Sequence, residues 1–193
     1  MFQTLWEYEI QPAAWERSLL QPIYKAGGKD TADPASYRGI YLSSAVAKLF
    51  EGILLHRLTQ YTEIHNTLTE NQLGTRPGRQ VHDAIYILLS VIQYNLLKKG
   101  KPTYVAFLDY STAFPSVFKV ALLSLLQKFN IVGKMWKHLR ARFRTVEVRV
   151  LHPQIPSSWW VRILRGLPEG SRLSPVLFGV MVADLILQLY LKL

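Results

Sequence analysis

The chain has 193 residues, of which 49% are hydrophobic and 12% aromatic, so disordered, collagen-like and low-complexity proteins are excluded and one sizeable domain is expected. A formal net charge of +10 favours a polyanionic partner: nucleic acid, nucleotide phosphate or an acidic membrane surface. Because there is no cysteine, disulfide bonds, thiolate metal sites and cysteine nucleophiles are also excluded.

The first hundred residues predict an extended segment followed by two helices. Residues 22–42 are rich in Gly, Asp and Pro and are expected to form a loop between short strands. Apolar residues then recur at helical spacing from Val46 to Tyr61, after a possible cap at Ser43 or Ser44. A second helix with one apolar face is expected to end at Gly100. The apolar residues on this one face are Val81, Ala84, Ile85, Leu88, Leu89, Ile92 and Leu96.

The second half of the chain predicts strands as well as helices. Residues 103–109, TYVAFLD, have the composition of a short buried strand. Helices are expected over 116–129 and up to 144, and residues 146–151 and 158–164 are expected to pair as a hairpin. The predicted fold class is therefore α+β, with helices early and an antiparallel sheet, packed on helices, in the second half.

The last segment, 173–193, is almost wholly apolar and has the length of a membrane span. It contains Asp184 and Gln188, however, and a carboxylate in the middle of a membrane span is costly. A buried helix of a soluble core is therefore favoured, and no membrane partner is expected.

Basic residues are concentrated between positions 119 and 172, which hold eleven Lys or Arg residues and only two acids. In this region the bases alternate with Trp136 and Phe143, a pattern compatible with a groove that follows a nucleic-acid backbone. The alternative interpretation is a solvated helix face. The predicted nucleic-acid contacts are Lys134, Lys137, Arg140, Arg142 and Arg144.

Asp109 is the one aspartate that ends a predicted apolar strand. A carboxylate at the end of a strand is well placed to bind Mg²⁺. Its alternative role is to cap the helix that follows.

Four segments of the chain, in order, resemble motifs of reverse transcriptases. Residues 107–117, FLDYSTAFPSV, resemble the first catalytic motif, and residues 165–180, RGLPEGSRLSPVLFGV, resemble the next one. Upstream, residues 23–58 and 71–85 resemble segments of the fingers. The resemblance covers about residues 20–185 and is closest to the enzymes of non-LTR retrotransposons and group II introns.

This resemblance implies the fingers and an incomplete palm of a right-hand polymerase. It divides the chain into an N-terminal extension at 1–20, fingers at 21–100 and a partial palm at 101–193, without the second catalytic hairpin or the thumb. Enzymes of this family use two Mg²⁺ ions for nucleotidyl transfer to a primer 3′-hydroxyl. The resemblance assigns Asp109 as the catalytic metal ligand and the carbonyl of Tyr110 as a second ligand.

The resemblance also predicts a dNTP site. Phe114 would lie beneath the incoming sugar and exclude a 2′-hydroxyl, while arginines of the fingers would contact the triphosphate. Structural alternatives are a core position for Phe114 and a bracing role for Arg38 and Arg76. The predicted dNTP-binding residues are Lys25, Arg38, Arg76, Thr112, Ala113, Phe114, Glu169 and Gly170.

The sequence departs from the family pattern at three places. Pro115 stands where an Asp is usual, Glu169 stands where Gln is usual, and the chain holds no Asp-Asp pair to match the Tyr-x-Asp-Asp motif. We therefore expect a truncated reverse transcriptase fragment from a mobile element that does not polymerise alone. It would aggregate or associate with a separate C-terminal palm and thumb polypeptide, and its other partners would be an RNA template, a DNA primer and dNTP.

Three further hypotheses remain open. The chain could be a non-catalytic RNA- or DNA-binding remnant, or a membrane-anchored protein held by residues 173–193. It could also derive from a viral RNA-dependent RNA polymerase, although the bulky Phe114 favours dNTP over NTP.

Overall fold

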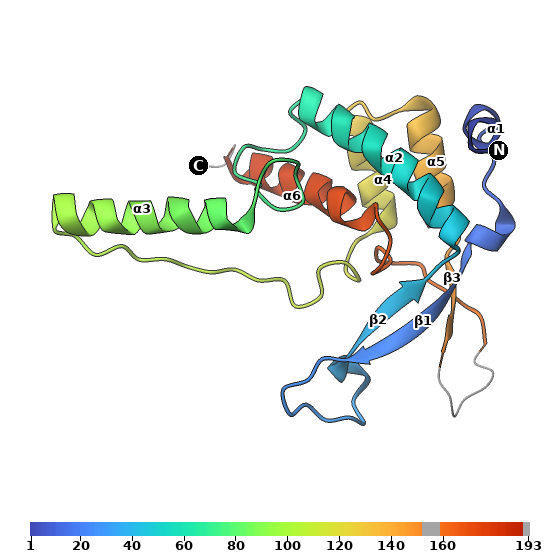
Figure 1. The fold of residues 1–193 in the computed structure, drawn as a ribbon, viewed down its shortest axis with the longest axis horizontal. Coiled ribbons are helices and arrows are strands. Elements are labelled where there is room, and N and C mark those ends of the chain that lie inside the picture. Colours follow the sequence, from blue (N-terminus) through green and yellow to red (C-terminus); the bar gives the residue numbers. More distant parts are fainter. Residues whose placement is uncertain (152–158, 191–193) are drawn as a thin grey trace.

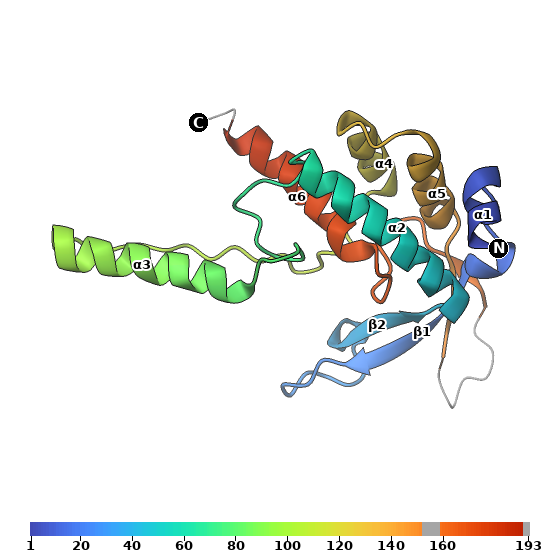
Figure 2. The same cartoon turned by 45° about the horizontal axis from the view of Figure 1, so that its top comes forward.

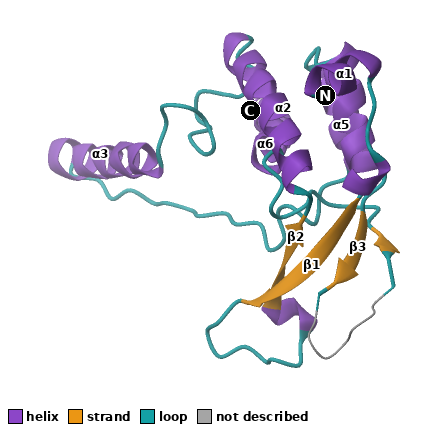
Figure 3. Cartoon of the chain, turned by 45° about the vertical axis from the view of Figure 1, so that its right-hand side comes forward, coloured by secondary structure: helices purple, strands orange, loops and turns teal. Residues whose placement is uncertain are grey.

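The computed structural model describes residues 1–151 and 159–190 of the chain, the side chains of residues 189 and 190 excepted. These residues form six α-helices, two short 3₁₀ helices and one four-stranded sheet. Most of the helices gather into one layer, and the sheet extends from the base of that layer (Figures 1 and 3). The hydrophobic core lies in the helical layer and in the segments that join its helices.

The sheet is mixed, with strand order β2-β1-β3-β4. β1 (Arg17–Tyr24) pairs antiparallel with β2 (Tyr37–Leu42) and parallel with β3 (Glu147–Val150), which pairs antiparallel with β4 (Val161–Arg162). The predicted β3–β4 hairpin is confirmed, although its connection at 152–158 lies outside the described residues. The prediction of an antiparallel sheet confined to the second half is wrong, because the central strand β1 comes from the N-terminal region.

The helical core combines α2 (Ala45–Ile64), α4 (Lys119–Lys128), α5 (Gly133–Arg144) and α6 (Ser174–Tyr190). All four helices were predicted. Their fully buried side chains include Leu54, Leu58, Leu122, Leu126, Leu139, Phe143 and Leu177. On α2 the buried face is rotated from the predicted one, because Val46 and Leu49 are exposed and Glu51 is buried.

Asp184 connects two of these helices. Its carboxylate lies 2.5 Å from Nζ of Lys128 on α4 and also accepts a hydrogen bond from Gln188. The carboxylate therefore fixes α6 against the core, as expected for a buried helix. Among the described residues, every helix is too short or too polar to cross a membrane.

The helix α3 (Val81–Lys99) forms as predicted, with a capping box between Gln80 and Asp83 and with Gly100 in the left-handed conformation at its end. It projects away from the helical layer (Figures 1 and 2), and none of its residues is buried. The apolar face that the spacing predicts is therefore exposed in the described structure. No described helix or strand packs along that face. Helical periodicity identifies an apolar face, but it does not show whether another element covers that face.

The predicted strand at 103–109 is absent from the described structure. This segment runs back from the end of α3 as an extended chain (Figure 1) without strand pairing, and Tyr104 and Leu108 are 92% and 97% exposed. A strand is stabilised by the N–H and C=O groups of a neighbouring strand, and no described strand pairs with this segment. Its β-branched and aromatic composition was therefore insufficient to form one.

The first residues pack onto α5. Glu7, in the short helix α1 (Phe2–Tyr8), forms an ion pair with Lys134 of α5. Glu9, just after that helix, forms one with Lys137. β1 then begins at Arg17. The segment predicted as an N-terminal extension thus contributes to the helical layer and to the sheet, while the domain boundaries stay a prediction.

Candidate functional site

A cleft of about 690 Å³ lies between the β1–β2 hairpin and the segment that precedes α4. Its lining comes from three distant parts of the chain: the hairpin, residues 109–115 and the turn at 169. Eight of the residues predicted to bind metal or dNTP line this one cleft: Lys25, Arg38, Asp109, Tyr110, Thr112, Ala113, Phe114 and Glu169.

Backbone hydrogen bonds hold one wall of the cleft against the Gly-Leu-Pro turn. The N–H of Gly166 donates to the carbonyl of Val117 at 2.8 Å, and the N–H of Leu167 donates to the carbonyl of Phe114 at 2.9 Å. Gly166 has a φ of +87°, and a Cβ at this position would lie 2.9 Å from Cα of Pro115. Glycine is therefore required here by both conformation and space.

The same turn is fixed to the edge of the sheet. The N–H of Tyr41 in β2 donates to the carbonyl of Glu169 at 2.7 Å. Gly170, with a φ of +110°, brings its backbone so close that a Cβ would lie 2.9 Å from the carbonyl oxygen of Tyr41. Burial and the neighbouring Glu169 raise the pKa of the Tyr41 hydroxyl. Gly170, which was predicted to bind dNTP, therefore positions the turn and does not line the cleft. Its neighbour Glu169 does line the cleft.

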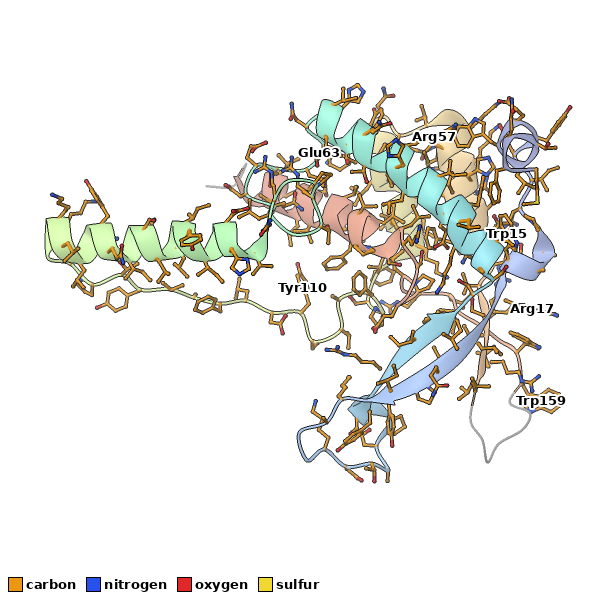
Figure 4. All side chains as sticks on the ribbon, in the orientation of Figure 1. Trp15, Arg17, Arg57, Glu63, Tyr110 and Trp159 are labelled. Atoms are coloured by element: carbon orange, nitrogen blue, oxygen red, sulfur yellow. The ribbon has the colours of Figure 1, made fainter. Side chains whose placement is uncertain are left out.

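Two aromatic rings of the cleft pack on α6. Phe114 is half-buried with its ring centroid 5.5 Å from that of Phe178, and Tyr110 meets the same ring edge-on at 5.7 Å. Figure 4 shows Tyr110 directed toward α6 from the loop below it. Phe114 therefore has both a core contact and a place in the cleft, so the two interpretations of this residue coexist.

The cationic side chains of the cleft lie on the hairpin. Lys25 donates to the carbonyl of Ala35 at 2.9 Å, which holds its ammonium group near the loop, and Arg38 is exposed on β2. Lys29, in the same loop, also lines the cleft and was missed by the sequence analysis. Its position in the Gly- and Asp-rich loop beside Lys25 was the available signal.

The acidic side chains of the cleft are few. Asp109 is exposed and, with Glu169, is one of two carboxylates that line it. Within residues 1–151 and 159–190, no group of three or more His, Cys, Asp or Glu side chains is placed to hold a metal ion. This donor set does not fit a two-ion catalytic centre, which needs several carboxylates around a pair of divalent cations.

Arg76 lies outside the cleft and braces the loop between α2 and α3. Its guanidinium binds the carboxylate of Glu63 through two hydrogen bonds of 2.7 and 2.9 Å and donates to the carbonyl of Thr69. The side chain is 2% exposed, and its hydrogen bonds lower the pKa of Glu63. These contacts correct the prediction of a triphosphate contact and agree with the bracing alternative.

Arg142 is buried rather than available to nucleic acid. Its Nε lies 2.7 Å from a carboxylate oxygen of Glu51, and its guanidinium also donates to the carbonyl of Trp15. Glu51 in turn accepts hydrogen bonds from the Ser171 hydroxyl and from the N–H of Arg172. We therefore remove Arg142 from the predicted nucleic-acid contacts. Glu51 was missed because a single acid on a helix gives no sign of distant partners.

The other four predicted nucleic-acid contacts divide into two pairs. Lys134 forms an ion pair with Glu7 of α1, and Lys137 forms one with Glu9, which follows that helix. Arg140 and Arg144 are exposed, and the guanidinium of Arg140 lies over the ring of Trp136 at 5.3 Å from its centroid. The structure thus leaves a smaller basic surface on α5 than the sequence predicted.

Comparison with known proteins gives a consistent set of relatives. Residues 23–193 match the family model described as reverse transcriptase (RNA-dependent DNA polymerase). The chain is 30% identical over 189 residues to the probable RNA-directed DNA polymerase from transposon BS of Drosophila melanogaster, covering 96% of this chain and 20% of that protein. It is 25% identical over 191 residues to the RNA-directed DNA polymerase from mobile element jockey of the same fly, with the same coverage.

A further relative is the retrovirus-related Pol polyprotein from type-1 retrotransposable element R2 of Nasonia vitripennis. The identity is 28% over 158 residues, which covers 82% of this chain and 15% of that protein. The chain therefore spans a fifth or less of the length of these relatives.

Proposed function

This chain belongs to the reverse transcriptase (RNA-dependent DNA polymerase) family of retrotransposons, and we propose that it forms the dNTP-binding part of such a polymerase. The relatives are polymerases of mobile elements, and members of the family work on a nucleic-acid template and primer. The chain corresponds to about a fifth of the relatives' length, so it represents a reverse transcriptase fragment.

The convergence of the motifs on one cleft supports this proposal. Lys25, Lys29 and Arg38 line one side, where they would neutralise the negative charge of a triphosphate. Thr112 and Ala113 line the opposite side, and their small side chains leave the backbone N–H groups accessible to phosphate oxygens. A nucleoside triphosphate is therefore the ligand whose charge best matches this lining.

Phe114 would determine which sugar is accepted. Its ring is held from below by Phe178, so it cannot easily move away from an incoming ligand. A 2′-hydroxyl that presses on such a fixed ring is rejected by contact, which favours dNTP over NTP.

Asp109, with the backbone carbonyl of Tyr110, would bind at most one divalent ion, for which we propose Mg²⁺. The other metal ligands that the family needs are lacking among the described residues, and Glu169 adds a negative charge that opposes a triphosphate. We therefore propose that this chain alone binds dNTP without transferring it. The RNA template, the DNA primer and a further palm and thumb polypeptide would complete the polymerase.

A titration with a fluorescently labelled dNTP in Mg²⁺ tests the proposal on the full chain. Replacing Arg38 with alanine should weaken binding by about tenfold, the loss expected for a charge-assisted hydrogen bond. Arg140→Ala removes the same charge from exposed α5 and should leave the Kd unchanged. Asp109→Asn should abolish the dependence of binding on Mg²⁺. Equal weakening by Arg38→Ala and Arg140→Ala would show that only overall charge matters and would contradict the proposal.

A second candidate function is non-catalytic binding of RNA or DNA. The exposed Arg140 and Arg144 on α5 favour this function. Arg140 lies over the aromatic ring of Trp136, and Arg144 lies at the end of the same helix. Binding of an RNA–DNA duplex with a steep salt dependence and no need for a divalent ion would support this function.

A further inference from the structure

One face of the sheet is basic and aromatic, and the polymerase motifs do not account for it. Strand alternation places Arg17 of β1, Glu147 and Arg149 of β3, and Trp160 and Arg162 at β4 on this side, which we call the outer sheet face. The register sets Glu147 beside both Arg17 and Arg162. Around Leu19, which the register pairs with Arg149, the outer sheet face thus carries three arginines, one glutamate and one tryptophan.

The two faces of these strands differ in burial at Ser18 and Val148, whereas at the end of the sheet Val161, on the opposite face, is 56% exposed. Ser18 and Val148, on the opposite face, are each 4% exposed and pack toward the body of the protein. On the outer sheet face, the side chain of Arg17 is 58% exposed and Trp160 is 39% exposed. Arg17 and Trp160 of the outer sheet face are therefore solvated, and they are not needed to fill the core.

The ring of Trp160 is held in place. The guanidinium carbon of Arg17 lies 5.0 Å from the ring centroid, and Nε of Arg17 lies 3.0 Å from a carboxylate oxygen of Glu147. The ion pair fixes the arginine, and the arginine fixes the tryptophan through a cation–π contact. A ring already ordered in this way loses little conformational entropy when another flat group stacks on it.

A flat aromatic ring between arginines has the chemistry that recognises single-stranded nucleic acid. Bases stack on exposed aromatic side chains, while arginines bind the phosphates between them, and solvated sheet faces are common platforms for such strands. The charge balance of three arginines to one glutamate favours a polyanion over a peptide strand at the open edge of β4.

We propose that the outer sheet face binds single-stranded nucleic acid, with a base stacked on Trp160 and phosphates held by Arg17 and Arg162. None of these three residues lines the cleft, although Arg38, which pairs with Ile23, lies on the same side of the sheet farther along β1. Figure 4 shows Arg17 and Trp159 beyond the sheet from Tyr110. The proposal uses none of the residues on which dNTP binding depends, so either one can fail while the other stands.

Fluorescence anisotropy with labelled twelve-nucleotide oligo-U RNA and oligo-dT DNA tests this proposal on the full chain, without dNTP, primer or divalent ion. Replacing Trp160 with alanine should weaken binding about tenfold or more, the effect expected on loss of a stacked base. Trp160→Phe, which keeps an aromatic ring, should restore binding to within about threefold of the parent. Affinity for both oligonucleotides supports a site for base and phosphate, whereas a preference for RNA indicates an additional contact to the 2′-hydroxyl.

The arginine contact has a matched control elsewhere in the molecule. Arg57 on α2 lies 4.1 Å from the ring centroid of Trp6, so Arg57→Ala removes the same kind of Arg–Trp pair and the same charge. Arg17→Ala should weaken binding and lower the slope of log affinity against log salt by about 0.7, the value for one phosphate contact on a single strand. Arg57→Ala should change neither the affinity nor the slope.

Three results would overturn the proposal: no binding of either oligonucleotide, unchanged affinity in Trp160→Ala, or equal weakening by Arg17→Ala and Arg57→Ala. Thermal melts of all variants show whether a loss of affinity reflects unfolding. Labelled-dNTP binding in the Trp160→Ala variant separates the two sites, because it should equal that of the parent whichever way the oligonucleotide experiment turns out.

Discussion

The backbone N–H of Leu167 donates a hydrogen bond to the carbonyl of Phe114 over 2.9 Å. This contact joins two segments more than fifty residues apart, each of which resembles a catalytic motif of reverse transcriptases. It places the Gly-Leu-Pro turn directly against the segment that begins at Asp109. The candidate cleft depends on this junction, and the first prediction tests it.

Gly166→Ala should destabilise the protein by about 2 kcal/mol or more, because a Cβ would lie 2.9 Å from Cα of Pro115 at a φ of +87°. Gly27 provides a matched control, since its φ is +83° and a Cβ there would meet nothing within 4 Å. Gly27→Ala should therefore show the conformational cost alone. Urea unfolding of the two variants measures the difference, and equal losses would contradict the close packing at Pro115.

The buried ion pair between Glu51 and Arg142 should contribute strongly to folding. Glu51→Gln leaves an uncompensated guanidinium that is 5% exposed and should cost about 3–5 kcal/mol of unfolding free energy. Glu9→Gln breaks the half-exposed pair with Lys137 and should cost less than about 1 kcal/mol. Comparable losses in chemical denaturation would mean that Arg142 is solvated, which would return it to the predicted nucleic-acid surface.

The sequence predicted the helices well because their apolar periodicity is local. It also identified most of the cleft, since Lys25, Arg38, Asp109 and Phe114 fall in motifs whose order could be matched. The parallel pairing of β1 with β3 could not be predicted, because it joins segments about 130 residues apart. Local composition carries no information on such a register.

The wrong predictions have a common physical cause. Arg142 lies in the last turn of a basic helix, where arginines are usually solvated, and its partner Glu51 is 91 residues away in the sequence. The segment 103–109 has a composition typical of strands but no described strand beside it. Both outcomes depend on tertiary neighbours, whereas the predictions used only the residues themselves.

Lys119 should make stability depend on pH in the alkaline range. Its buried ammonium donates to the carbonyl of Ile163, and burial, together with the nearby Arg162, lowers the pKa of Lys119 from 10.5 to about 8. Between these two values the unfolded chain binds a proton that the native state has released, so unfolding free energy rises with pH.

The gain from Lys119 should reach at most about 3 kcal/mol between pH 8 and pH 10.5. Because tyrosines also titrate in this range, the measurement is the difference between the parent and Lys119→Met in urea unfolding at several pH values. The parent should gain stability relative to the variant as pH rises. Parallel curves would show that the amine has its ordinary pKa.

The apolar side chains of α3 should influence association rather than folding. Leu97 is 78% exposed, so Leu97→Lys should change unfolding free energy by less than about 0.5 kcal/mol while reducing self-association in sedimentation experiments. Leu126 on α4 is fully buried, and Leu126→Ala should cost about 2–5 kcal/mol. A large destabilisation by Leu97→Lys would show that α3 packs against the body of the protein in solution.

The most direct test of dNTP binding is photo-crosslinking of the full chain with an azido derivative of dATP, followed by mass spectrometry of the labelled peptides. We predict labelling within residues 25–39 or 109–115 or beside Glu169, competed by unlabelled dATP and reduced in Arg38→Ala. Labelling confined to α3 or α5, or labelling that unlabelled dATP does not displace, would contradict the assignment of this cleft.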